Sequence, residues 1–195
     1  MNLPNKITFS RIIITILIIT LLIFPMDAMG FNLPKIFVNE TIVMDTKYII
    51  AGCLFILASV TDFLDGYIAK KNNLETTFGK VLDNLADKIL VNSILIILSA
   101  YGFIHPIIPV VIIVRDSIAN SIRIILGSKG IDLVTTKLSK VKSYLIMIGI
   151  TLTLFYNLPF ELFNLRVSDF ILIVAVIISL ASLFKYYEFA KEKLK

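Results

Sequence analysis

The sequence predicts an all-α protein, a polytopic integral membrane bundle of six transmembrane helices. Hydrophobic residues make up 57% of the chain and its mean hydropathy is +0.91, whereas soluble domains are roughly 45–50% apolar. The apolar runs are long and do not alternate with polar residues, which excludes barrel strands, and in hydrocarbon only a helix or a closed barrel satisfies its own backbone. No stretch remains for a soluble module, so residues 1–195 are expected to form one transmembrane domain.

Each expected helix is an apolar stretch bounded by charged or turn residues and close to the 20 or so residues that cross a bilayer core of about 30 Å. The first follows the basic N-terminus and stops before a proline, and the fourth starts after another proline. In chain order the helices are Ile7 to Phe24, Lys47 to Ala69, Val81 to Phe103, Ile107 to Leu126, Val141 to Leu158 and Asp169 to Ala190. The segment 25–46 is expected to be a loop with room for short interfacial structure.

The basic residues predict the orientation of the bundle. Of the 19 lysines and arginines, only Lys35, Lys47 and Arg166 fall on one side of the predicted membrane. By the positive-inside rule, both termini are therefore cytoplasmic and the protein lies in the cytoplasmic membrane of a bacterial-type cell. The net charge of +5 is then attributed to contact with anionic membrane lipid, and nucleic acid is not an expected partner.

Several common chemistries are excluded by the residue inventory. His105 is the single histidine and Cys53 the single cysteine, so paired-histidine transfer, serine-histidine-aspartate hydrolysis and Cys/His zinc sites lack partners at useful spacing. No phosphate-binding loop of the Walker type occurs. The first apolar run resembles a signal peptide, but the residues after Pro25 form a poor cleavage site, so this run is expected to remain as a helix. Carboxylates and basic residues are the chemistry that remains.

Four aspartates beside the membrane-spanning runs, Asp62, Asp65, Asp83 and Asp87, are the most costly side chains to place. A carboxylate at mid-membrane depth costs roughly 2.5–3.5 kcal/mol, and close carboxylates repel one another unless a cation holds them. Oxygen ligands without histidine or cysteine suit Mg²⁺, Mn²⁺ or Ca²⁺, and paired carboxylates suit a two-metal cluster. The alternative is that these aspartates cap helices or pair with interfacial lysines; two pairs on consecutive helices exceed what capping requires.

Spacing places the four aspartates on two facing helical stripes. Asp62 and Asp65 are three residues apart, Asp83 and Asp87 four apart, and the connection between the two helices is long enough for a reversal of direction. Small residues continue both stripes and leave space for a ligand or a neighbouring helix; they are Gly66, Ala69 and Gly79.

The run from Asp62 to Asp87 resembles the signature of the CDP-alcohol phosphotransferase family. It reads D-F-L-D-G-Y-I-A-K, eight residues, then G-K-V-L-D-N-L-A-D, and every spacing agrees with D-x-x-D-G-x-x-A-R-x8-G-x3-D-x3-D. Lys70 departs from the pattern, because the family has arginine there. Lysine keeps the positive charge but loses the planar fork that grips a phosphate at two points.

The resemblance implies a six-helix fold, a homodimer, CDP-diacylglycerol as donor, and two divalent metal ions, Mg²⁺ or Mn²⁺. Asp62, Asp65 and Asp83 would hold the metals, with Asp87 as a further ligand and as general base. The positions that match those near the CDP-lipid in the family are Gly66, Ala69, Lys70, Thr76, Gly79, Asn5 and Thr8.

Within the family, the segments on either side of the motif are similar to members that use glycerol 3-phosphate as acceptor. The resemblance covers the opening Asn2 to Arg11 and a basic region from Arg115 to Ser143, from which Asp116, Ser139 and Ser143 depart. The residues expected to bind the acceptor phosphate are Arg115, Arg123, Lys137 and Lys140, whose alternative role is contact with lipid headgroups.

Two other functions remain open at this point. A transferase of the same family could use another alcohol, such as phosphatidylglycerol in a cardiolipin synthase. A divalent-cation transporter could use the aspartates as an ion path, although their clustering toward one membrane face disfavours a path.

Overall fold

The computed structural model describes the backbone of residues 3–25, 30, 33–38, 42–71, 77–131 and 137–194. It describes side chains at these positions except 3–6, 63–71, 77, 78, 80 and 194. Within this part of the chain the helices are α1 (Leu3–Ile23), α2 (Thr46–Lys71), α3 (Thr77–Ala100), α4 (Ile107–Ser128), α5 (Lys137–Leu154) and α6 (Val167–Leu194), with a short 3-10 helix, η2 (Phe160–Phe163). Each predicted helix has an observed counterpart, so the prediction of six helices is confirmed.

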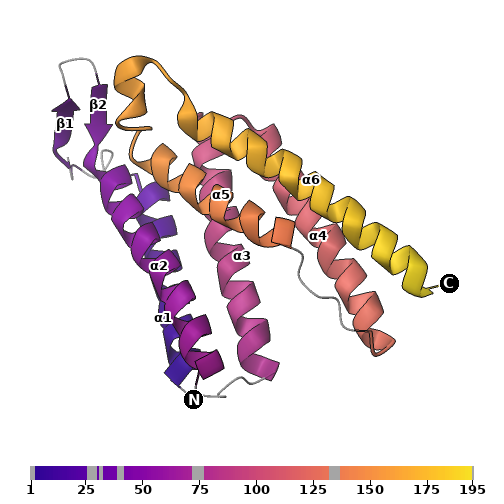
Figure 1. Cartoon of the computed structure of the whole chain (residues 1–195). Coiled ribbons are helices and arrows are strands. Elements are labelled where there is room, and N and C mark those ends of the chain that lie inside the picture. The colour runs from indigo at the N-terminus through magenta and orange to yellow at the C-terminus, as the bar shows by residue number, and fades with distance from the viewer. Residues whose placement is uncertain are drawn as a thin grey trace.

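A short antiparallel hairpin lies in the segment that was expected to be a loop. Strands β1 (Lys35–Val38) and β2 (Ile42–Asp45) pair with Lys35 opposite Asp45. The strands are mostly apolar and contain several β-branched residues, which favour strands, but each has only four residues. The hairpin and η2 lie at one end of the bundle, and the N-terminus and the connected ends of α2 and α3 lie at the other (Figure 1).

The predicted and observed helix ends differ most at α5. This helix ends at Leu154, earlier than the predicted Leu158, because Tyr156 and Asn157 adopt left-handed backbone angles, with φ of 56° and 55°. The amide of Asn157 then donates back to the carbonyl oxygen of Leu152 at 2.6 Å, which satisfies a carbonyl at the helix end. The apolar residues on both sides of Asn157 carry the hydropathy boundary past this stop.

Only part of the membrane prediction is tested by helix length and composition. Among the described residues, the stretch Val167–Lys193 of α6 is long and apolar enough to cross a membrane, and Ile7–Ile23 of α1 is apolar but shorter. Six crossings therefore remain a prediction.

The helices pack in two connected groups. Helix α1 packs against α2 and α3, while α6 packs against α4 and α5. The buried core that joins the two groups includes Ile18, Phe55, Leu95 and Ile150, each with no exposed surface. At Gly149 helices α5 and α6 approach so closely that an added Cβ would lie 2.6 Å from Leu172 Cδ2, so only glycine fits without displacement of the Leu172 side chain.

Candidate active site

One arginine connects the two helices that carry the aspartate pairs. The Arg11 Nη1 atom lies 2.5 Å from Asp62 Oδ1 and 2.9 Å from Asp83 Oδ1. Arg11 belongs to α1, Asp62 to α2 and Asp83 to α3, so a single nitrogen joins three helices. The Arg11 side chain is fully buried, whereas those of Asp62 and Asp83 are 29% and 44% exposed. Two carboxylates therefore compensate the charge of a buried cation, and both carboxylates are partly exposed to solvent.

Asp87 lies one turn after Asp83 on α3 and within electrostatic range of Asp62, Asp83 and Arg11. Its Oδ1 atom is buried and, among the described residues, no group donates a hydrogen bond to it. An unsatisfied buried carboxylate oxygen is costly and marks a position where a cation or a proton donor is required.

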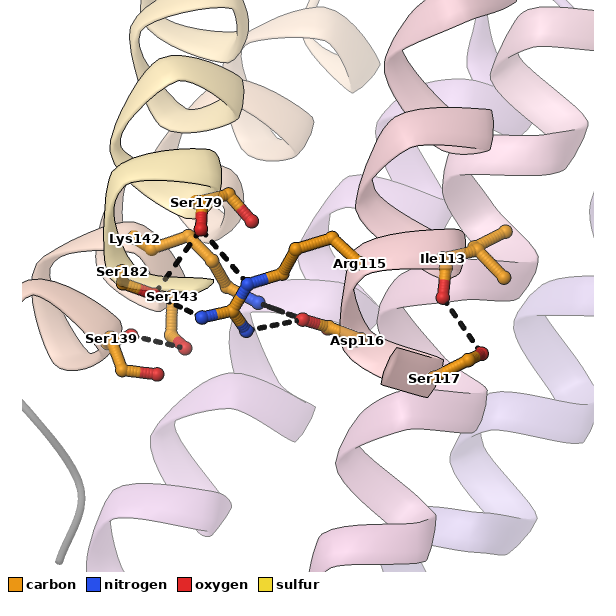
Figure 2. A network of polar contacts seen from close by, with 9 residues as sticks. All are labelled: Ile113, Arg115, Asp116, Ser117, Ser139, Lys142, Ser143, Ser179 and Ser182. Atoms are coloured by element: carbon orange, nitrogen blue, oxygen red, sulfur yellow. Dashed lines mark hydrogen bonds and ion pairs between the residues drawn. The ribbon is translucent and has the colours of Figure 1, made fainter. Parts of the chain in front are cut away.

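A second polar cluster joins α4, α5 and α6 (Figure 2). Arg115 donates from Nε to the Ser179 carbonyl oxygen at 2.9 Å, from Nη1 to Asp116 Oδ1 at 2.8 Å, and from Nη2 to the Ser182 hydroxyl. Lys142 donates to both oxygens of Asp116, at 2.7 and 2.9 Å. Arg115 and Lys142 are both buried. Two buried cations thus share one carboxylate.

The two clusters meet at a small cavity of about 30 Å³. Its lining includes Asp87 on α3, Asp116 on α4 and Lys142 on α5. Lys142 also acts electrostatically on Asp87. A positively charged group from the second cluster therefore faces the aspartate that the sequence singles out as general base.

The other predicted site residues divide into three groups. Thr8 is buried on α1, one turn before Arg11, and Gly79 is half-buried at the start of α3. Arg123 is half-buried on α4, whereas Lys137 and Lys140 are exposed at the start of α5. The predictions that lie outside the described side chains are Asp65, Gly66, Ala69, Lys70, Thr76 and Asn5.

Three of the residues that build these clusters were not predicted as site residues: Arg11, Asp116 and Lys142. Arg11 entered the sequence analysis only through the charge count and the N-terminal resemblance. Its signal is an arginine inside the first apolar run, because an ionisable residue within a membrane segment points to a function and requires a partner. The partners of Lys142 have no local signal, since Asp116 lies 26 residues away in the chain.

The residue types at this site suit a hard divalent cation. Asp62 and Asp83 converge on a positive group, and the buried Oδ1 of Asp87 accepts no hydrogen bond from the described residues. Carboxylate oxygens are the ligand type that hard divalent cations prefer. In the part of the chain with described side chains, which excludes Asp65, no three carboxylate, histidine or cysteine groups come close enough together to hold a metal ion. The positive group on which Asp62 and Asp83 converge is the Arg11 guanidinium.

Comparison with known proteins identifies the family of this chain. Residues 1–183 match the family model of CDP-alcohol phosphatidyltransferase. A Bacillus subtilis (strain 168) protein named CDP-diacylglycerol–glycerol-3-phosphate 3-phosphatidyltransferase is 37% identical over 194 residues, which cover 100% of this chain and 97% of that protein. Proteins of the same name are 30% identical in Rickettsia felis, over 98% of this chain and 96% of the relative, and 34% identical in Mycoplasma pneumoniae, over 79% and 68%. The chain belongs to the CDP-alcohol phosphatidyltransferase family, a family of membrane enzymes.

Proposed function

We propose that the protein transfers a phosphatidyl group from CDP-diacylglycerol to glycerol 3-phosphate, with release of CMP and phosphatidylglycerophosphate. The observation that carries this proposal is the match, over the whole chain, to a relative named for this reaction. The polar clusters support it, because carboxylates and cations lie together at one end of a helical bundle and no histidine or cysteine takes part. The protein is thus an enzyme of anionic phospholipid synthesis.

The proposed metal site consists of Asp62, Asp65, Asp83 and Asp87, with two Mg²⁺ or Mn²⁺ ions as cofactors. Enzymes of this family generally depend on divalent metals. When bound there, two divalent cations supply Lewis-acid stabilisation of the diphosphate charge as CMP leaves. Support for this site comes from the buried, unpaired Oδ1 of Asp87 and from the shared cation between Asp62 and Asp83.

Asp87 is the proposed general base. It accepts the proton of the glycerol 3-phosphate hydroxyl, whose oxygen attacks the lipid-side phosphorus of CDP-diacylglycerol. The bond from that phosphorus to the CMP oxygen breaks, and CMP leaves toward the cytoplasm. A carboxylate oxygen without a hydrogen bond inside the protein is able to take this proton, which supports the assignment.

The donor nucleotide is proposed to bind along the ends of α1, α2 and α3. Thr8 lies one turn from Arg11 on α1 and so comes close to the aspartates. The remaining residues proposed for this subsite are Asn5, Gly66, Ala69, Lys70, Thr76 and Gly79.

The phosphate of the acceptor is proposed to bind basic residues of α4 and α5. Lys137 and Lys140 are exposed and available to a soluble substrate. Arg123 is half-buried on the same helix as Arg115. Each nitrogen of Arg115 donates a hydrogen bond within the protein, so Arg115 contributes its charge from a fixed position.

The proposed arrangement in the membrane places the active site and both termini on the cytoplasmic side of six crossings. The N-terminus lies at the same end of the bundle as the aspartate-bearing ends of α2 and α3 (Figure 1). This placement lets the lipid donor stay in the bilayer while a soluble acceptor enters from the cytoplasm. A homodimer is the proposed assembly, by resemblance to the family.

Product analysis tests the proposal. Purified protein is incubated with CDP-diacylglycerol, Mg²⁺ or Mn²⁺, and either glycerol 3-phosphate, phosphatidylglycerol or no acceptor. We expect CMP and phosphatidylglycerophosphate in equal amounts, and only with glycerol 3-phosphate. Cardiolipin formed from phosphatidylglycerol would assign another acceptor, and Mn²⁺ uptake into vesicles without nucleotide would indicate a transporter.

A further inference from the structure

Arg11 occupies the position between Asp62 and Asp83 that a bridging cation would be expected to take. The same nitrogen, Nη1, contacts one oxygen of each carboxylate, at 2.5 and 2.9 Å. The two carboxylates come from different helices, and no other described cation forms a salt bridge with both of them. The guanidinium is therefore the group that neutralises this pair.

The charge of Arg11 is permanent, because a guanidinium is not deprotonated in proteins. Its side chain has no exposed surface, and a cation taken out of water is tolerated only when close anions compensate it. Asp62 and Asp83 provide this compensation. In return, Arg11 relieves the repulsion between two carboxylates that face each other across α2 and α3.

We propose that Arg11 is an internal counter-ion of the aspartate site. It holds Asp62 and Asp83 together before a divalent cation binds, and it competes with that cation for the same oxygens. The inference rests on the proposed function, in which Asp62 and Asp83 are metal ligands. Arg11 is thus a positioning residue, since it acts through the carboxylates.

Competition follows from the donor atoms. Mg²⁺ requires oxygen ligands at about 2.0–2.1 Å in near-octahedral geometry, and Asp62 Oδ1 and Asp83 Oδ1 are already hydrogen-bonded to Nη1. A guanidinium close to a divalent cation also repels it. For metal to bind, Arg11 has to move away from at least one of these oxygens, and this displacement lowers the apparent affinity of the site.

The experiment measures metal binding and stability directly. The full chain, reconstituted in lipid nanodiscs, is titrated with Mn²⁺, free Mn²⁺ is followed by electron paramagnetic resonance, and thermal unfolding is recorded in EDTA and in saturating Mn²⁺. Arg11→Met removes the charge and keeps an unbranched apolar stem, and Arg11→Lys keeps the charge. Arg166→Met removes an exposed arginine that lies near Ser168 and Asp169, at the start of α6, and serves as the control.

For Arg11→Met we expect the half-saturating Mn²⁺ concentration to fall by about tenfold, the scale of one lost charge-assisted hydrogen bond. Its Tm in EDTA should fall, and the rise in Tm on addition of Mn²⁺ should exceed that of the wild type. Arg11→Lys should shift both quantities in the same direction by less, and Arg166→Met should shift neither. If Arg11→Met does not fold without metal, Arg11→Lys carries the test.

An unchanged or higher half-saturating concentration in Arg11→Met, or in Arg11→Lys where only that variant folds, would overturn the inference. The proposed function would survive this result, provided that the wild type binds Mn²⁺ and releases CMP. A wild type that binds no Mn²⁺ would overturn the proposed metal site, and the role of Arg11 with it.

Discussion

Lys142 on α5 donates hydrogen bonds to both carboxylate oxygens of Asp116 on α4, at 2.7 and 2.9 Å. The pair is reinforced by Arg115, which donates to the same carboxylate and reaches α6 through Ser179 and Ser182. Hydrogen bonds centred on the Asp116 carboxylate, whose side chain is 17% exposed, thus connect α4, α5 and α6 beside the cavity that Asp87 also lines. The network fixes the position of the charged side chains that line this cavity with Asp87.

Removal of this carboxylate should strongly destabilise the protein. Asp116→Asn removes the carboxylate charge to which the buried cations Lys142 and Arg115 are hydrogen-bonded, and loss of one partner of a buried ion pair costs about 3–5 kcal/mol. Thermal unfolding in detergent micelles measures the effect. Asp45→Asn is the matched control, because Asp45 pairs with Lys35 at 3.7 Å on an exposed hairpin, where a pair is worth about 1 kcal/mol or less. Equal losses in the two variants would contradict the assigned role of the network.

Helix packing at Gly149 should not tolerate even one methyl group. An added Cβ would lie 2.6 Å from Leu172 Cδ2, and Leu172 is fully buried, so Gly149→Ala should destabilise the protein by about 1–3 kcal/mol. Gly127→Ala on α4 is the control, since nothing lies within 4 Å of its added Cβ. This control should be neutral or stabilising by up to about 1 kcal/mol. A Gly149→Ala protein as stable as the control would show that α5 and α6 pack less closely.

Arg123 should affect one substrate more than the other. If its guanidinium binds the phosphate of the acceptor, Arg123→Ala should raise the KM for glycerol 3-phosphate by about tenfold and leave the KM for CDP-diacylglycerol within about twofold. Initial rates of CMP release, with each substrate varied in turn, provide both constants. Arg166→Ala, on the exposed segment before α6, should change neither. An unchanged acceptor KM in Arg123→Ala would remove this residue from the acceptor site.

Hydropathy predicted the helices well because each is a long apolar run between polar boundaries. The end of α5 was missed, since the left-handed turn at Tyr156 and Asn157 has apolar residues on both sides and hydropathy alone does not mark it. The β1–β2 hairpin was missed because four-residue strands are too short for a clear alternating pattern.

The sequence predicted only those contacts of the site that follow from residue spacing along two neighbouring helices. Asp62, Asp83 and Asp87 share a motif, so their approach follows from helix periodicity. The contact of Arg11 with Asp83 joins residues 72 positions apart, and such pairing depends on how α1 packs against α3. A buried arginine signals that some anion must be near, but sequence alone does not say which one.

The central claim is that Asp87 removes the acceptor proton at a carboxylate site that also binds metal. The most direct measurement is CMP release from CDP-diacylglycerol and glycerol 3-phosphate by Asp87→Asn and by the wild type, at saturating Mn²⁺ and both substrates. Loss of a general base predicts a fall in kcat of about 10²–10⁴-fold, in a protein that remains folded by thermal unfolding. Asp169→Asn, at the start of α6, should retain wild-type activity. A folded Asp87→Asn protein with wild-type kcat would contradict the account.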